Sequence, residues 1–115
     1  MRQSKTLTGK PFSYEGALQT ELKVHTKGSI VDVSAEVITF VMGELMRAEE
    51  TAMGASRDDP IPGSLGDKLK SEMGASPQVL SYLIPLLQEV GFCTAVKQGR
   101  AFVVRRPTRW RATGR

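Results

Sequence analysis

The residues best suited to binding chemistry lie at the end of the chain, in VKQGRAFVVRRPTRWRATGR. Residues 97–115 hold seven Lys and Arg residues and no carboxylate, whereas residues 1–96 hold nine basic and twelve acidic residues. A mildly acidic body therefore precedes a strongly basic end, and the two add up to the net charge of +4. This asymmetry is typical of proteins that bind nucleic acid or another polyanion. The alternative interpretation is a tail that only increases solubility.

The spacing of these cations indicates two parts. Gly99 provides the turn of a predicted β-hairpin, and Pro107 ends its second strand. Arginines spaced along the extended chain that follows can each neutralise a phosphate. Trp110 is placed to stack on a sugar or base, or else to pack back on the domain. The contacts predicted here are Lys97, Gln98, Arg100, Arg105, Arg106, Arg109, Trp110 and Arg111.

Catalysis has little support in the residue types. The single histidine, His25, and the single cysteine, Cys93, lie far apart in the sequence, and no glycine-rich phosphate-binding motif has the required spacing. His25 has no second metal-ligating neighbour and is expected on the surface. Cys93 is expected in the core. We therefore expect no enzymatic activity, no metal and no cofactor.

The elements that would position the basic residues are helices. Residues 34–53 carry an apolar stripe behind an N-capping Ser34, and residues 64–73 form a shorter helix closed by Gly74. Residues 76–90 begin with Ser76 and Pro77 and form a third, apolar helix. A hairpin over residues 92–106 follows.

The first 29 residues are polar with scattered apolar positions. Leu18, Leu22 and Val24 alternate weakly, which leaves both a strand and a frayed helix open. We expect an N-terminal arm here, ordered only where it packs on the body or on a partner chain.

The predicted elements follow the order of a winged helix-turn-helix: a helix, a short helix, a tight turn, a helix and a hairpin. The predicted fold class is mainly α with a small β-hairpin, that is, three helices plus a wing. The predicted organisation is an arm over residues 1–29, a winged-helix domain over 30–106 and a basic tail over 107–115.

The segment IPGSLGDKLKSEMGASPQVLSYLIPLLQEVGFCTAVKQGRAFVV resembles the DNA-binding region of GntR-type winged-helix regulators. The resemblance covers about residues 30–106 and implies a wing at QGRAFVV. It departs from the family in two ways. The chain has no room for the usual effector domain, so no small-molecule effector is implied. The second and third helices also lack the arginines that the family uses for DNA contact.

Without those arginines, base reading falls to polar side chains of the third helix. Gln can pair with adenine, and Ser and Tyr can reach phosphate. Lysines on the second helix would add phosphate contacts. A solvated helix face is the alternative for each of them. The predicted residues are Lys68, Lys70, Ser76, Gln78, Ser81 and Tyr82.

The function expected from these patterns is a double-stranded DNA-binding homodimer, acting as a transcriptional repressor or regulator, or as a replicon or partition factor. Its dimer surface would come from helix 34–53 and the arm. No apolar run approaches membrane-spanning length and no signal peptide is evident, so we expect a cytoplasmic, nucleoid-associated protein. The alternative is a protein–protein interaction module in a nucleoprotein assembly. RNA binding through the same basic surface is a third hypothesis.

Overall fold

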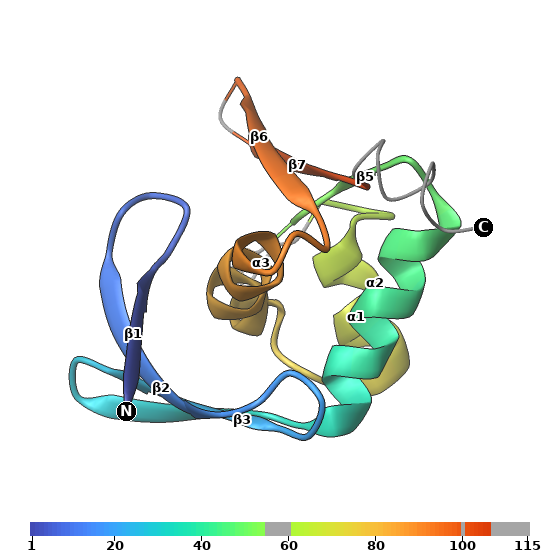
Figure 1. The fold of residues 1–115 in the computed structure, drawn as a ribbon. Helices are drawn as coiled ribbons and strands as arrows, with labels where there is room; N and C mark the ends of the chain where they lie inside the picture. Colours follow the sequence, from blue (N-terminus) through green and yellow to red (C-terminus); the bar gives the residue numbers. More distant parts are fainter. Residues whose placement is uncertain (55–60, 100, 107–115) are drawn as a thin grey trace.

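The computed structural model describes residues 1–54, 61–99 and 101–106. Along the chain it places four strands, a helix, a short strand, two further helices and a final strand pair (Figure 1). The strands form two antiparallel sheets, one of four strands and one of three, and the helices lie between and beside them.

The first 33 residues form the four-stranded sheet, in which the strands follow one another in chain order. They are β1 (Arg2–Lys5), β2 (Pro11–Gly16), β3 (Leu22–Thr26) and β4 (Ser29–Val33). Side chains alternate between the two faces of a strand. The apolar ones on the inner face are buried, among them Phe12, Tyr14, Leu22, Val24 and Val33. Residues 1–29, which the sequence analysis treats as an arm, thus form most of a sheet that packs on the core of its own chain.

The first helix, α1 (Ala35–Arg47), begins where the sequence predicts. The Ser34 hydroxyl accepts the Val37 N–H at 3.2 Å and caps the helix. The helix ends at Arg47, however, and not at Gly54. Part of the remainder forms the strand β5 (Glu50–Ala52), because its backbone bonds to another strand instead of continuing the helix.

The second helix, α2 (Leu65–Met73), matches the predicted boundaries. It starts at the N-cap Ser64 and ends at Gly74, whose left-handed backbone (φ 65°) closes the helix.

The third predicted helix is divided into two parts. Ser76 caps a single 3₁₀ turn, η1 (Pro77–Val79), and α3 (Leu80–Glu89) follows it. Pro85 lies inside α3 without ending it.

The three-stranded sheet has the order β5–β7–β6. Its outer strand β6 (Thr94–Gln98) and central strand β7 (Ala101–Arg105) form the predicted hairpin, with Gln98 paired to Ala101 across the turn. The addition of β5 to β7 ties the hairpin to the segment that follows α1.

The helix α3 occupies the centre of the molecule, between the two sheets (Figure 1). It is apolar on nearly all sides, and such a helix is stable only when it is covered all round. The α3 residues that are at most 2% exposed are Leu80, Leu83, Ile84, Leu86 and Leu87.

A close backbone approach holds α2 against the segment after β5. The Gly66 N–H donates to the Met53 carbonyl at 2.9 Å. A Cβ on Gly66 would lie 1.8 Å from the Gly54 carbonyl oxygen, so only glycine fits there. Gly66 costs helix stability by its intrinsic propensity, but it allows α2 to pack closely here.

The predicted fold class is wrong. About 35% of the described residues are helical and 33% are in strands, so the protein is a mixed α/β structure and not a mainly α winged helix. The difference comes from the four-stranded sheet. That sheet depends on pairing between segments that are each too short and too polar to signal a buried strand by themselves.

Candidate nucleic-acid interface

The hairpin β6–β7 carries two of the exposed basic residues that the sequence predicts to bind, Lys97 and Arg105. Lys97 and Gln98 are exposed at the end of β6, and Gly99 adopts φ +63° in the turn. Lys97 pairs with Phe102, so it lies on the same sheet face as the buried Val104. The hairpin projects beyond the body (Figure 1), and Lys97 is therefore exposed although this face is covered at its base.

The two arginines at the end of β7 have different surroundings. Arg105 is exposed, and its Nε lies 3.5 Å from Glu50 Oε1 on the neighbouring strand β5. The guanidinium of Arg106 donates through Nη1 to the Met46 carbonyl at 2.6 Å. That carbonyl belongs to the last turn of α1, so Arg106 closes the end of this helix. Arg105 thus forms an exposed ion pair, whereas Arg106 has a structural role at the end of α1.

The lysines of α2 also differ. The Lys68 ammonium lies 3.2 Å from Glu44 Oε1 on α1, and Glu44 also lies 3.6 Å from Arg47. Lys68 therefore joins the two helices, and its charge is partly compensated. Lys70 is exposed on α2.

The residues predicted to read bases do not form one exposed face of a helix. The Tyr82 ring packs edge-on against Phe12 of the four-stranded sheet, with centroids 5.2 Å apart and an interplanar angle of 76°. The Ser76 hydroxyl accepts the Gln78 N–H at 3.2 Å and serves as a cap. Gln78 and Ser81 are half-buried. Of these residues, Tyr82 is thus covered by the four-stranded sheet.

The last turn of α3 joins the two sheets. The Ser4 hydroxyl of β1 donates to a carboxylate oxygen of Glu89, and the Ala95 N–H of β6 donates to Gln88 Oε1 at 2.7 Å. Two consecutive residues thus bind one sheet each. This part of α3 is a structural junction and presents an acidic group, which disfavours contact with phosphate.

Four of the predicted site residues, Arg100, Arg109, Trp110 and Arg111, lie outside the described residues. Among the others, the structure brings Lys97 and Gln98 together at the hairpin and places Lys68 and Lys70 on another element. The residues predicted in the 76–90 segment lie on η1, its N-cap and the first turn of α3, and not on the hairpin.

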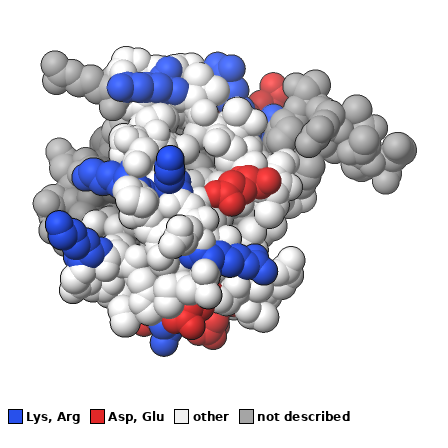
Figure 2. Space-filling model, turned by 60° about the vertical axis from the view of Figure 1, so that its left-hand side comes forward, with Lys and Arg blue, Asp and Glu red and all other residues white. Residues whose placement is uncertain are grey.

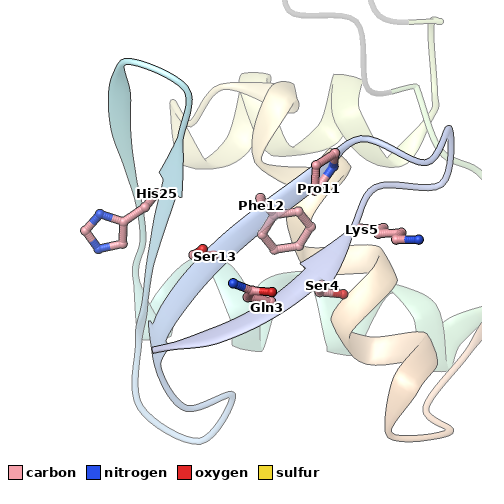
Figure 3. Close-up of a pocket in the computed structure, with 7 residues that line it drawn as sticks. All are labelled: Gln3, Ser4, Lys5, Pro11, Phe12, Ser13 and His25. Carbon is pink, nitrogen blue, oxygen red and sulfur yellow. The ribbon is translucent and has the colours of Figure 1, made fainter.

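One surface was missed by the sequence analysis. On the outer face of the four-stranded sheet, Gln3, Ser13 and His25 stand directly opposite one another on β1, β2 and β3. They line a shallow hollow of about 350 Å³ together with Ser4, Lys5, Pro11 and Phe12. Figure 3 shows Lys5 and His25 at opposite ends of the hollow, with Gln3 and Ser13 between them. In each strand, these outward residues alternate with residues that point into the core. This alternation could have predicted the outer face, but only after the segments had been recognised as strands.

The cysteine and the histidine lie in different surroundings. Burial raises the pKa of Cys93 to about 12, so this thiol stays protonated and inert. The described residues contain no group of three or more His, Cys, Asp or Glu side chains that could hold a metal ion. His25 is paired with Glu15, Nε2 to Oε2, at 2.6 Å on the sheet surface.

Within the same described ranges, no helix is long and apolar enough to cross a membrane. Comparisons of the chain with protein-family models, with curated proteins and with solved structures found no match.

Proposed function

We propose that the protein binds double-stranded DNA, mainly through backbone phosphates, by means of the β6–β7 hairpin and the basic residues that follow it. The observation that carries this proposal is the exposed Lys97 and Gln98 on a projecting hairpin that contains no acidic residue. Arginines continue this charge beyond β7 without an intervening carboxylate. Lys and Arg contacts of this kind supply affinity through counterion release and depend little on base sequence.

In this proposal α3 supports the interface and does not read bases. The Tyr82 ring of α3 packs against Phe12, and the last turn of α3 forms hydrogen bonds to both sheets. We therefore expect modest sequence discrimination. Occupation of a promoter or replicon site at sufficient protein concentration is the simplest mechanism for a repressor, regulator or partition factor, and it implies a cytoplasmic, nucleoid-associated protein.

A homodimer fits the same proposal, because two copies double the number of phosphate contacts. The N-terminal sheet packs on its own chain, so it does not act as an exchanged arm. The outer side of α1 offers Thr39, Gly43 and the 51% exposed Met46 for such a contact.

The proposal is tested by fluorescence anisotropy with a labelled duplex at about 50 and about 200 mM salt. We expect binding whose logarithmic affinity falls linearly with the logarithm of salt concentration. Lys97→Gln should reduce the magnitude of the slope by about 0.9, the value for one phosphate contact. The matched control is Lys27→Gln, because Lys27 lies in the β3–β4 turn, at the far end of the molecule from the hairpin (Figure 1).

Two results would overturn the proposal. One is an absence of duplex binding at the lower salt concentration. The other is an equal loss of slope in the Lys97 and Lys27 variants, which would mean that any surface lysine has the same effect.

A second hypothesis, docking of a protein partner, is favoured by one observation. Val90, at the end of α3, is 67% exposed and borders a hollow of about 260 Å³ that is also lined by Leu18, Leu22 and Leu86. A photo-cross-linking residue in place of Val90 should then form a specific protein adduct in cells, whereas one in place of Arg47 on α1 should not. Equal labelling from both positions would contradict this hypothesis.

A further inference from the structure

The outer face of the four-stranded sheet carries a row of polar side chains at one end. Gln3 faces Ser13, and Ser13 faces His25, across three neighbouring strands. Directly opposite residues in antiparallel strands have Cβ atoms about 4.5–5.5 Å apart. Lys5 follows Gln3 by two residues on β1, and so it lies on the same face.

These residues form a hollow whose polar groups are mainly hydrogen-bond donors. The Gln3 amide, the Lys5 ammonium and the Ser13 hydroxyl can all donate. No carboxylate lines the hollow. Two carboxylates lie beside lining residues: Glu15 pairs with His25 Nε2 at 2.6 Å, and Glu89 accepts the Ser4 hydroxyl. A small oxyanion carried on a flexible chain fits this set of groups.

The charge of the sheet face is positive only at this end. Lys23 on β3 faces Glu15 on one side and Asp32 on the other, so acidic neighbours compensate it. Lys5, in contrast, faces Pro11, which directly follows Lys10. Lys5 therefore has no acidic residue directly opposite it across the strands, and it also lines a neighbouring hollow that includes Glu89.

The sheet and the hairpin belong to one side of the molecule. Figure 2 views the structure from the side on which β1 and β2 lie, and it shows Lys and Arg side chains spread over this face with acidic side chains in only a few places. The turns of β1–β2 and β6–β7 both point toward the top of Figure 1, the first to the left of α3 and the second above it. A polyanion bound at the hairpin can therefore extend toward the sheet.

We propose that the hollow of Gln3, Lys5 and Ser13 binds a phosphate of the nucleic-acid backbone and is a second contact surface beside the hairpin. This inference rests on the proposed function for its ligand, a phosphodiester strand. It assigns a binding role to the N-terminal sheet, and it predicts a longer footprint on DNA than a hairpin contact alone would give.

The first experiment compares two lysines of the same sheet face in the full-length protein. Lys5→Gln should lower the magnitude of the salt slope for duplex binding by about 0.9. Lys23→Gln removes the same charge from a compensated position and should leave the slope unchanged. Ser13→Ala should weaken binding without changing the slope. All three side chains are on the outer face, and equal melting temperatures will verify that each variant is folded.

A second experiment tests the hollow without DNA. Inorganic phosphate is titrated into isotope-labelled protein, and sodium chloride at equal ionic strength is the control. We expect saturable NMR shifts of the Gln3, Lys5 and Ser13 signals with phosphate only. These shifts should persist in Lys23→Gln and disappear in Lys5→Gln. Identical shifts with chloride, or no shifts at these residues, would overturn the inference.

The two experiments separate the two proposals. Duplex binding that depends on Lys97 but is unaffected by Lys5→Gln contradicts the hollow and leaves the proposed function intact. Absent duplex binding together with specific phosphate shifts contradicts the proposed function and supports an anion-binding hollow.

Discussion

The two antiparallel sheets contact the same helix, α3, but they cover it to different extents. The four-stranded sheet covers α3 with a broad inner face that includes Phe12 and Leu22, whereas the three-stranded sheet is buried at its base around Val104 and projects at its tip. A sheet that is backed along its whole length contributes mainly packing. A hairpin that extends past the core holds its end residues in solvent at a fixed orientation, which suits them for contact with a partner.

The surroundings of the lysines differ in the same way. Lys23 in the middle of the larger sheet is flanked across the strands by Glu15 and Asp32. Lys97 on the hairpin faces Phe102, and neither β6 nor β7 contains an acidic residue. Lys97 therefore has no acidic residue directly opposite it, whereas Lys23 has one on each side.

The largest expected effect concerns the helix shared by the sheets. Leu83 is fully buried, so Leu83→Ala should lower the free energy of unfolding by about 2–5 kcal/mol. Urea denaturation followed by circular dichroism measures this. Val90→Ala, at a 67% exposed position of the same segment, should change it by less than about 0.5 kcal/mol. Similar losses from both variants would show that α3 is not the common support of the two sheets.

A smaller effect is expected from a matched pair of helical glycines. Gly66→Ala would place a Cβ 1.8 Å from the Gly54 carbonyl oxygen and should destabilise the protein by about 1–3 kcal/mol. Gly43 lies in α1 with nothing within 4 Å of an added Cβ, so Gly43→Ala should stabilise the protein by about 0.5–1 kcal/mol. Thermal melting distinguishes the two. Stabilisation by Gly66→Ala would refute the close contact between α2 and the segment after β5.

The smallest effects separate neighbouring arginines. Arg106→Ala removes the hydrogen bond to the Met46 carbonyl and should cost about 1 kcal/mol, with little change in the salt slope. Arg105→Ala removes an exposed ion pair and should cost about 0–0.5 kcal/mol, but it should lower the slope for DNA. Denaturation and anisotropy on both variants test this. A larger loss of stability from Arg105→Ala and a larger loss of salt slope from Arg106→Ala would contradict this assignment of roles.

Local chemistry made much of the chain after β4 predictable. The caps Ser34, Ser64 and Ser76 and the terminator Gly74 act through bonds to nearby backbone, so short sequence windows reveal them. The hairpin turn at Gly99 is equally local.

The four-stranded sheet could not be predicted in this way. Phe12 and Tyr14 on β2, like Leu22 and Val24 on β3, give only two inward apolar residues for each strand, and the pairing between strands is non-local. Because the sheet was missed, Tyr82 was assigned to a free surface although it packs on Phe12. One signal was present, since the continuous apolar run over residues 83–87 is typical of a helix that is covered on all sides.

The central claim is that the projecting hairpin, and not α3, contacts DNA. It is tested most directly by the amide NMR spectrum of the labelled full-length protein during titration with a duplex, because each perturbed signal locates the contact. The account predicts shifts at Lys97, Gln98 and Gly99, with the signals of Gln78, Ser81 and Tyr82 unchanged. Shifts concentrated at Gln78, Ser81 and Tyr82, with the hairpin signals unchanged, would contradict it.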